Sequence, residues 1–251
     1  MTASQPTHES SRRVRKEVER VQHEHSDVTG GWLRPAVFGM SDGLVSNFAL
    51  IAGVAGGSSG STEHKAVVLA GLAGLAAGAF SMAAGEFISV RSQAEQAEAE
   101  IEVERREIEA RPEAEERELA MMYVAKGLEP ELARQVAQQL SRDPEAALDV
   151  HVREELGIDR GDLPSARLAA GSSFLSFSIG AVLPLLPYLL GATSLWPAMV
   201  VAALGLFLCG AFVTKFTPRP WWYGGARQLG VGALAALVTY GIGSAVGTSV
   251  S

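Results

Sequence analysis

Five apolar stretches, each close to 20 residues long, constrain this chain more than any other feature of its sequence. They run roughly over residues 35–57, 65–90, 168–190, 195–216 and 224–249. A helix needs about 20 apolar residues to cross a hydrocarbon core of about 30 Å. Since backbone polar groups in lipid must be satisfied within the segment, each stretch is expected to be a helix. The sequence therefore predicts an all-α membrane protein with five transmembrane helices.

The charge gathers between the second and third apolar stretches. Residues 91–167 hold 20 of the 28 acidic residues but only 11 of the Lys and Arg residues. This segment is dense in good helix formers, and we expect its first helix to continue out of span two until Pro112 breaks it. A helical cytoplasmic domain inserted between helices 2 and 3 is predicted. The expected parts are a cytoplasmic N-terminal segment (1–34), helices 1–2 (35–90), the acidic domain (91–167) and helices 3–5 (168–251).

The distribution of basic residues predicts the orientation. Residues 1–34, 91–167 and 215–227 hold 6, 11 and 3 Lys and Arg residues, and the other side holds Lys65 alone. Cytoplasmic loops carry the excess of positive charge, so the N-terminus should be cytoplasmic and the C-terminus outside.

The first 30 residues lack the apolar core of a signal peptide. Valines at i, i+4 and i+7 (Val14, Val18, Val21) predict a short amphipathic helix there.

Three side chains inside the first two spans are candidates for an ion path: Asp42, Met82 and Glu86. A carboxylate at membrane depth costs about 2.5–3.5 kcal/mol on insertion scales, so it needs a partner or a function. Asp42 and Met82 each lie seven or eight residues inside the cytoplasmic end of their span, which is roughly 10–12 Å. Glu86 is one helical turn nearer the cytoplasm than Met82. Carboxylate oxygen with thioether sulfur suits a borderline cation such as Fe²⁺ better than Mg²⁺ or Ca²⁺.

The acidic domain offers a second candidate site. Glu104 and Glu107 are spaced i, i+3, as are Glu115 and Glu118, so each pair lies on one helical face. If Pro112 breaks the helix, the two pairs could face each other across a turn. Glutamates at 154 and 155, with His151 one turn away, are further candidate ligands. The alternative is a solvated acidic face with compensating arginines, because many other glutamates surround these.

The chain resembles the vacuolar iron transporter family, which includes the calcium-cross-complementer proteins. The resemblance covers nearly all of residues 30–250 and rests on FGMSDGLVSNFALIAGVAGG, GAFSMAAGEFISVRSQ, the acidic helices, DPEAALDVHVREELGI and PLLPYLL. It implies a five-span homodimer that moves Fe²⁺ out of the cytoplasm, with proton exchange, along a path at the dimer interface lined by the first spans. By position, it assigns Asp42 and Met82 to this path. The implied metal-binding glutamates are Glu104, Glu107, Glu115, Glu118 and Glu155.

The sequence departs from the family pattern just before the last of these glutamates. Members have methionines there, whereas this chain has His151 and Val152. The absence of an organelle-targeting segment and the compact ends favour a bacterial member in the cell (inner) membrane over a vacuolar one.

The expected function is detoxifying export of Fe²⁺, and of Mn²⁺ as a second cargo; Mn²⁺ and Zn²⁺ are further candidates as transported or domain-bound ions. The acidic domain would collect ions and Asp42 and Met82 would pass them on, while Glu86 assists or takes the exchanged proton. No tightly bound cofactor, no catalytic residue and no nucleic-acid partner are expected, so the chain should not be an enzyme. A non-transporting metal sensor or scaffold, and a passive divalent-cation channel, are the alternatives.

Overall fold

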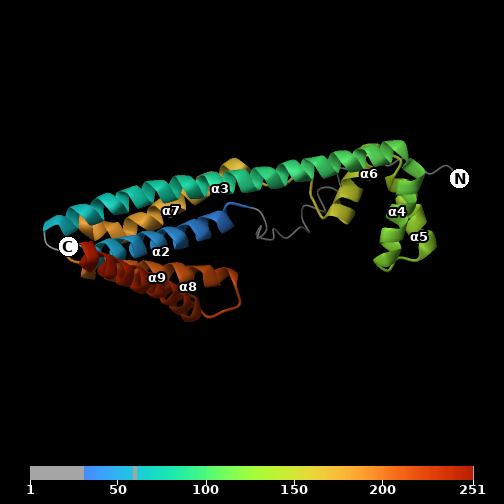
Figure 1. Cartoon of the computed structure of the whole chain (residues 1–251). Coiled ribbons are helices and arrows are strands. Elements are labelled where there is room, and N and C mark those ends of the chain that lie inside the picture. Colours follow the sequence, from blue (N-terminus) through green and yellow to red (C-terminus); the bar gives the residue numbers. More distant parts are fainter. Residues whose placement is uncertain (1–30, 59–60, 251) are drawn as a thin grey trace. The chain divides into compact units, whose positions relative to one another are not determined.

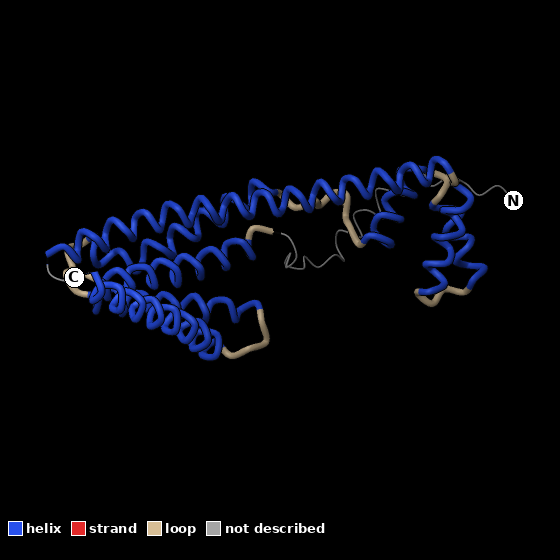
Figure 2. The backbone as a smooth tube through the Cα atoms, viewed as in Figure 1, coloured by secondary structure: helices blue, strands red, loops and turns tan. Residues whose placement is uncertain are grey.

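The computed structural model describes residues 31–58 and 61–250, and all its elements are helical within those ranges (Figures 1 and 2). The predicted amphipathic helix around Val14 to Val21 lies outside the described residues. Five helices are long and apolar enough to cross a membrane: α2 (Leu33–Gly57), α3 (Ser61–Ala110), α7 (Ala166–Leu189), α8 (Leu195–Val213) and α9 (Trp221–Val250). Three shorter helices lie between α3 and α7: α4 (Pro112–Ala125), α5 (Pro130–Leu140) and α6 (Pro144–His151).

The predicted all-α fold with five candidate spans is confirmed, with small differences at the ends. The fourth span stops at Val213, and residues Thr214–Phe216 form a 3-10 turn instead of a last helical turn. Large apolar side chains remain exposed along the spans, as expected for surfaces that face lipid tails rather than water. Examples more than two thirds exposed are Leu69, Phe80, Trp196 and Leu237. The chain is therefore a multi-pass membrane protein.

Helix α3 is the element that joins the apolar and the acidic parts of the chain. It runs without a break from Ser61 to Ala110, well past the apolar stretch that ends near Val90 (Figure 1). The next helix begins with Pro112 at its first position, where the missing N–H is not needed. Gly127, with φ of 99°, follows the end of α4, and Gly157, with φ of 66°, follows the turn after α6. The helix break predicted at Pro112 is confirmed.

Helix α2 is the centre of the membrane part, because it packs against all four other candidate spans. Its approach to α7 is very close. A Cβ atom at Gly43 would lie 2.3 Å from the Phe177 carbonyl oxygen, and one at Gly180 would lie 2.4 Å from the Met40 carbonyl oxygen. Small residues let helix backbones approach in this way, and the packing energy replaces the hydrophobic effect that lipid does not supply. This close packing fixes α2, the helix that carries Asp42, against α7.

Candidate functional site

The predicted pair Asp42 and Met82 lines one pocket in the membrane part. This pocket has a volume of about 340 Å³ and lies mainly between α2 and α3. Both side chains are half-buried, and Met82 also packs against the core cluster around Phe177. The two antiparallel helices therefore bring the carboxylate and the thioether to one place, as the sequence positions predict. The pocket contributes further oxygen atoms from Ser46, Asn47 and Ser81.

Glu86 does not line that pocket. It lines an adjoining pocket of about 520 Å³, which shares Asp42 with the first one and adds Arg34 and Arg227. Asp42 thus lies between a pocket that contains Met82 and a pocket that contains Glu86. This arrangement places the three predicted side chains in succession, with the aspartate in the middle.

Two glycines of α3 give the first pocket its shape. A Cβ atom at Gly78 would lie 2.3 Å from the Phe177 ring, and one at Gly74 would lie 2.4 Å from a Leu50 methyl group. These two glycines, spaced as GxxxG, therefore serve the close packing of α3 against its neighbours. The same two glycines also line the pocket, so backbone is present at its wall.

The acidic segment contains a buried group of metal-ligand side chains: Glu104 on α3, Glu115 on α4 and His151 at the end of α6. One ligand atom from each lies within 4.8 Å of the other two. Nδ1 of His151 is 3.0 Å from Oε1 of Glu104, but the angles do not make this contact a hydrogen bond. Both imidazole nitrogens are buried and have no hydrogen-bond partner among the described residues. Buried polar atoms are almost always satisfied, so these atoms fit a site that takes an ion.

Apolar neighbours explain why these polar side chains are buried. On α3, Ile101 and Ile108 flank Glu104, and Ile108 packs with Leu148 and Val152 beside His151. Helical spacing puts such neighbours on one face, so the isoleucines and the glutamate turn together toward α6. Apolar contacts between α3 and α6 therefore enclose these ligand side chains. A solvated acidic face would instead be exposed to water.

The electrostatics of the cluster follow from this burial. Desolvation first, and then the charges of Glu155, Glu115, Glu107 and Glu118, raise the pKa of Glu104 to about 7. Burial is also the main cause that raises the pKa of Glu115 and of Glu155. Burial lowers the pKa of His151, so its imidazole is neutral at pH 7 and keeps a lone pair for a metal ion. A divalent cation would relieve the repulsion among these carboxylates.

The remaining predicted ligands lie around the triad. Glu118 and Glu155 are exposed, and their charges act on Glu104. Glu107 is half-buried and forms a 3.0 Å ion pair with Arg111. Glu154, the neighbour of Glu155, forms an ion pair with Lys126 and is thereby engaged elsewhere. Of the six predicted ligands, three lie within 4.8 Å of one another. The other three are more exposed, and one of them, Glu155, contacts Glu104 through a side-chain hydrogen bond.

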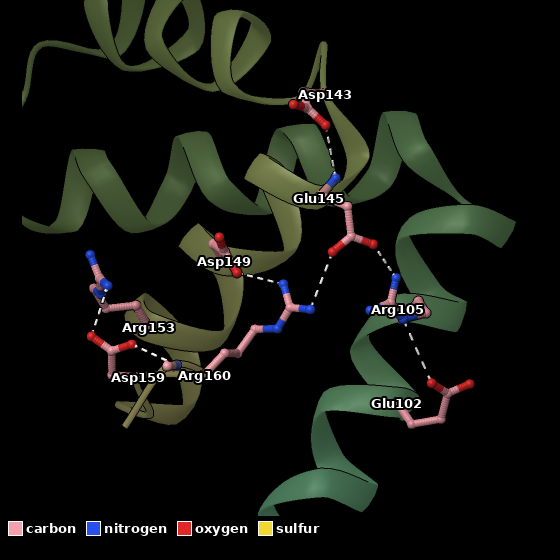
Figure 3. A network of polar contacts seen from close by, with 9 residues as sticks. Glu102, Arg105, Asp143, Glu145, Asp149, Arg153, Asp159 and Arg160 are labelled. Atoms are coloured by element: carbon pink, nitrogen blue, oxygen red, sulfur yellow. Dashed lines mark hydrogen bonds and ion pairs between the residues drawn. The ribbon is translucent and has the colours of Figure 1, made fainter. Parts of the chain in front are cut away.

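A network of ion pairs fastens α6 to α3 (Figure 3). Arg105 of α3 forms an ion pair with Glu145 of α6, and Arg160 bridges Glu145 and Asp149 at 3.2 and 2.5 Å. Asp143 accepts a hydrogen bond from the Glu145 backbone N–H at 3.1 Å and caps the helix. Since Arg105 follows Glu104 directly and α6 ends at His151, this network fixes the helix that carries the histidine.

Sequence reasoning missed three features of these sites. It did not single out Arg105, Glu145 and Arg160 as the network that orients α6. It did not predict the π-helical turn Val152–Leu156 that carries Glu155, a widened turn that is frequent at functional sites. It also passed over Asn47, although an amide inside an apolar span is a signal that was available.

Comparisons with known proteins agree with this architecture. The chain matches the model of the VIT family over residues 33–244. It is 35% identical over 232 residues to "Vacuolar iron transporter 1" of Oryza sativa subsp. japonica, which covers 90% of this chain and 91% of the relative. It is 37% identical over 235 residues to "Vacuolar iron transporter" of Acanthamoeba castellanii, with 88% and 81% covered. The family match spans both the membrane pocket and the buried acidic cluster, and the chain therefore belongs to the VIT family.

Proposed function

We propose that this protein transports Fe²⁺ out of the cytoplasm across the cell membrane and thereby protects the cell from excess metal. The observation that carries the proposal is the pocket that Asp42 and Met82 line together inside a five-span membrane protein. Its mixed oxygen and sulfur ligands suit a borderline cation such as Fe²⁺. The names of the relatives in Oryza sativa and Acanthamoeba castellanii, both vacuolar iron transporters, support iron as the cargo.

Residues 91–167 would form a cytoplasmic domain that captures the ion. Glu104, Glu115 and His151 would be the inner ligands, and Glu107, Glu118 and Glu155 would attract the cation from outside. Nitrogen and carboxylate ligands accept Fe²⁺, Mn²⁺ and Zn²⁺, so capture would be less selective than passage through the sulfur-containing pocket. In this division of roles, the cytoplasmic domain would concentrate the ion and the membrane part would select it.

The working unit would be a homodimer with α2 at its interface. Four residues at i+4 spacing form one incompletely covered face of α2: Phe38, Asp42, Ser46 and Leu50. Phe38 is 59% exposed and Leu50 is 38% exposed. A carboxylate on such a face would be costly against lipid, and a second copy packed on the face would enclose it in protein. The ion path would then run between the two copies.

Glu86 would take part in proton exchange. It shares a pocket with Asp42 and lies one turn closer than Met82 to the predicted cytoplasmic end of the second span. A carboxylate there could release a proton when the ion passes and regain it afterwards. The predicted orientation, with a cytoplasmic N-terminus and an external C-terminus, puts this glutamate at the entry of the path.

Uptake of labelled Fe²⁺ into proteoliposomes, with and without a pH gradient, tests the proposal. An exchanger follows the proton gradient, a passive channel ignores it, and a sensor or scaffold moves no iron. Asp42→Ala should abolish uptake while the protein still elutes as a folded species. Uptake by Asp42→Ala at the wild-type rate would show that the path does not use this pocket.

A further inference from the structure

The side chain of Asn47 is the most deeply buried amide described in the membrane part, at 2% exposure. Its Nδ2 donates a 2.6 Å hydrogen bond to the carbonyl oxygen of Ala181 on α7. Its Oδ1 is buried and has no hydrogen-bond partner among the described residues. An unsatisfied buried carbonyl oxygen in a native protein calls for an explanation, such as an ion that it ligates.

The orientation of this amide is determined by its partner. A backbone carbonyl only accepts hydrogen bonds, so the NH₂ group must face Ala181 and the oxygen must point away from it. The oxygen points toward α3, because a Cβ atom built on Gly74 would lie 3.1 Å from Oδ1. Asn47 and Gly74 both line the pocket that contains Asp42 and Met82. The free oxygen is therefore directed at the wall of the proposed ion path.

We propose that Oδ1 of Asn47 is an ion ligand in this pocket, one step beyond Asp42 and Met82 on the way out. The inference rests on the proposed function and adds a specific residue to its path. Asn47 follows Asp42 by five residues, which is roughly 7.5 Å along the helix. A cation that leaves the charged Asp42 would next meet a neutral oxygen. Passage requires sites that bind an ion weakly enough to release it, and a neutral amide suits this step better than a second carboxylate.

A purely structural role for Asn47 would also use the Ala181 hydrogen bond, which ties α2 to α7. The two roles differ in what happens to ion preference. If the oxygen is a ligand, its replacement changes which ions compete with Fe²⁺. If Asn47 only joins two helices, its replacement weakens the fold and slows all ions alike.

The test measures Fe²⁺ uptake into proteoliposomes, with Mn²⁺ and Cd²⁺ as competing ions. Asn47→Met replaces the oxygen by a sulfur, and Asn47→Leu removes the ligand without adding another. The control is Thr239→Val, because Thr239 of α9 donates a 2.7 Å hydrogen bond to the Ala49 carbonyl of α2 without lining this pocket. The control loses a helix-to-helix hydrogen bond of the same kind and leaves the lining intact.

Asn47→Met should weaken competition by Mn²⁺ relative to Cd²⁺ by at least about fivefold, since hard ions lose more when oxygen becomes sulfur. Asn47→Leu should lower the maximal uptake rate by about tenfold, the scale of one lost ligand interaction. Thr239→Val should keep both the ion preference and, within about twofold, the rate. If the folded Asn47 variants keep the wild-type ratio of Mn²⁺ to Cd²⁺ competition, the assignment of Asn47 as a ligand is wrong, while the proposed function still stands. A wild-type chain that moves no Fe²⁺ would overturn the proposed function and this assignment with it.

Discussion

Nδ1 of His151, at the end of α6, lies 3.0 Å from Oε1 of Glu104 in the middle of the polar half of α3. The two side chains are 1% and 6% exposed, and neither atom has a hydrogen-bond partner among the described residues. A carboxyl and an imidazole held this close, without the angles of a hydrogen bond, are arranged as two ligands of one ion. His151 occupies a position where the family resemblance implies methionine, so this chain offers nitrogen in place of sulfur.

Replacing His151 by leucine should separate metal binding from folding. Leucine fits the apolar neighbours Leu148 and Val152 and removes two unsatisfied buried nitrogens. We expect the affinity of the full-length protein in detergent for Mn²⁺ or Zn²⁺ to fall by about tenfold or more, while the apo protein melts no earlier than wild type. Isothermal titration and thermal melting measure the two effects. The control residue is His64, which contacts the Ala192 carbonyl oxygen and not the cluster. The variant His64→Leu should therefore bind metal as the wild type does.

Metal binding to the cluster should depend on pH around neutrality. Glu104 has a pKa of about 7 because of burial and neighbouring glutamates, and the proton must leave before the oxygen can bind a metal ion. Affinity should therefore fall as the pH drops from about 8 to about 6, with proton release on binding. Titrations in buffers of different ionisation enthalpy measure this release. A constant affinity across that range would contradict the role of Glu104.

The same raised pKa predicts how stability changes without metal. The folded state holds a proton on Glu104 that the unfolded state, with a pKa near 4.5, has lost. Between these two pKa values the folded state binds more protons, so its free energy of unfolding falls as the pH rises from about 4.5 to about 7. Glu104→Gln should remove this dependence. An identical pH profile in the variant and the wild type would assign the effect to other groups.

Two glutamates of the triad and two of the more exposed layer around it should matter more than four other glutamates nearby. Changing Glu104, Glu107, Glu115 and Glu118 to glutamine should reduce metal binding sharply, raise apo stability and lower transport most at low Fe²⁺. The matched control changes Glu95, Glu98, Glu102 and Glu109, which are exposed. Metal should stabilise the wild type and the control by mass action, but not the first variant. Equal loss of binding in both variants would leave only a diffuse acidic surface.

Met82→Leu tests the sulfur in the membrane pocket. Leucine keeps the volume and apolarity that pack against Phe177, so stability should change by less than about 1.5 kcal/mol. Fe²⁺ uptake should fall clearly, because the thioether ligand is gone. An unchanged uptake rate in proteoliposomes would return Met82 to a packing role.

The orientation has its own test. With five spans and a cytoplasmic N-terminus, a reporter enzyme fused after Ser251 should be active only outside the cytoplasm. Activity inside would mean that one of the five candidate helices does not cross the membrane.

The sequence by itself determined the helices and their order. Apolar runs of sufficient length and the proline at 112 are local signals, because each acts through chain geometry within a limited stretch of the chain. It also determined that Asp42 and Met82 would meet, since two neighbouring antiparallel spans leave little freedom in depth.

Only the tertiary structure decided which acidic residues form the buried cluster. Eleven glutamates lie between residues 95 and 118, and all of them read as helix formers on a charged face. Glu104 and Glu115 differ from the others because α3 and α4 meet at the break before Pro112, and because the packing of α6 on Ile108 buries them with His151. The free oxygen of Asn47 likewise follows from a hydrogen bond to Ala181, far away in the sequence. Such contacts depend on how distant helices pack, and no local pattern encodes that.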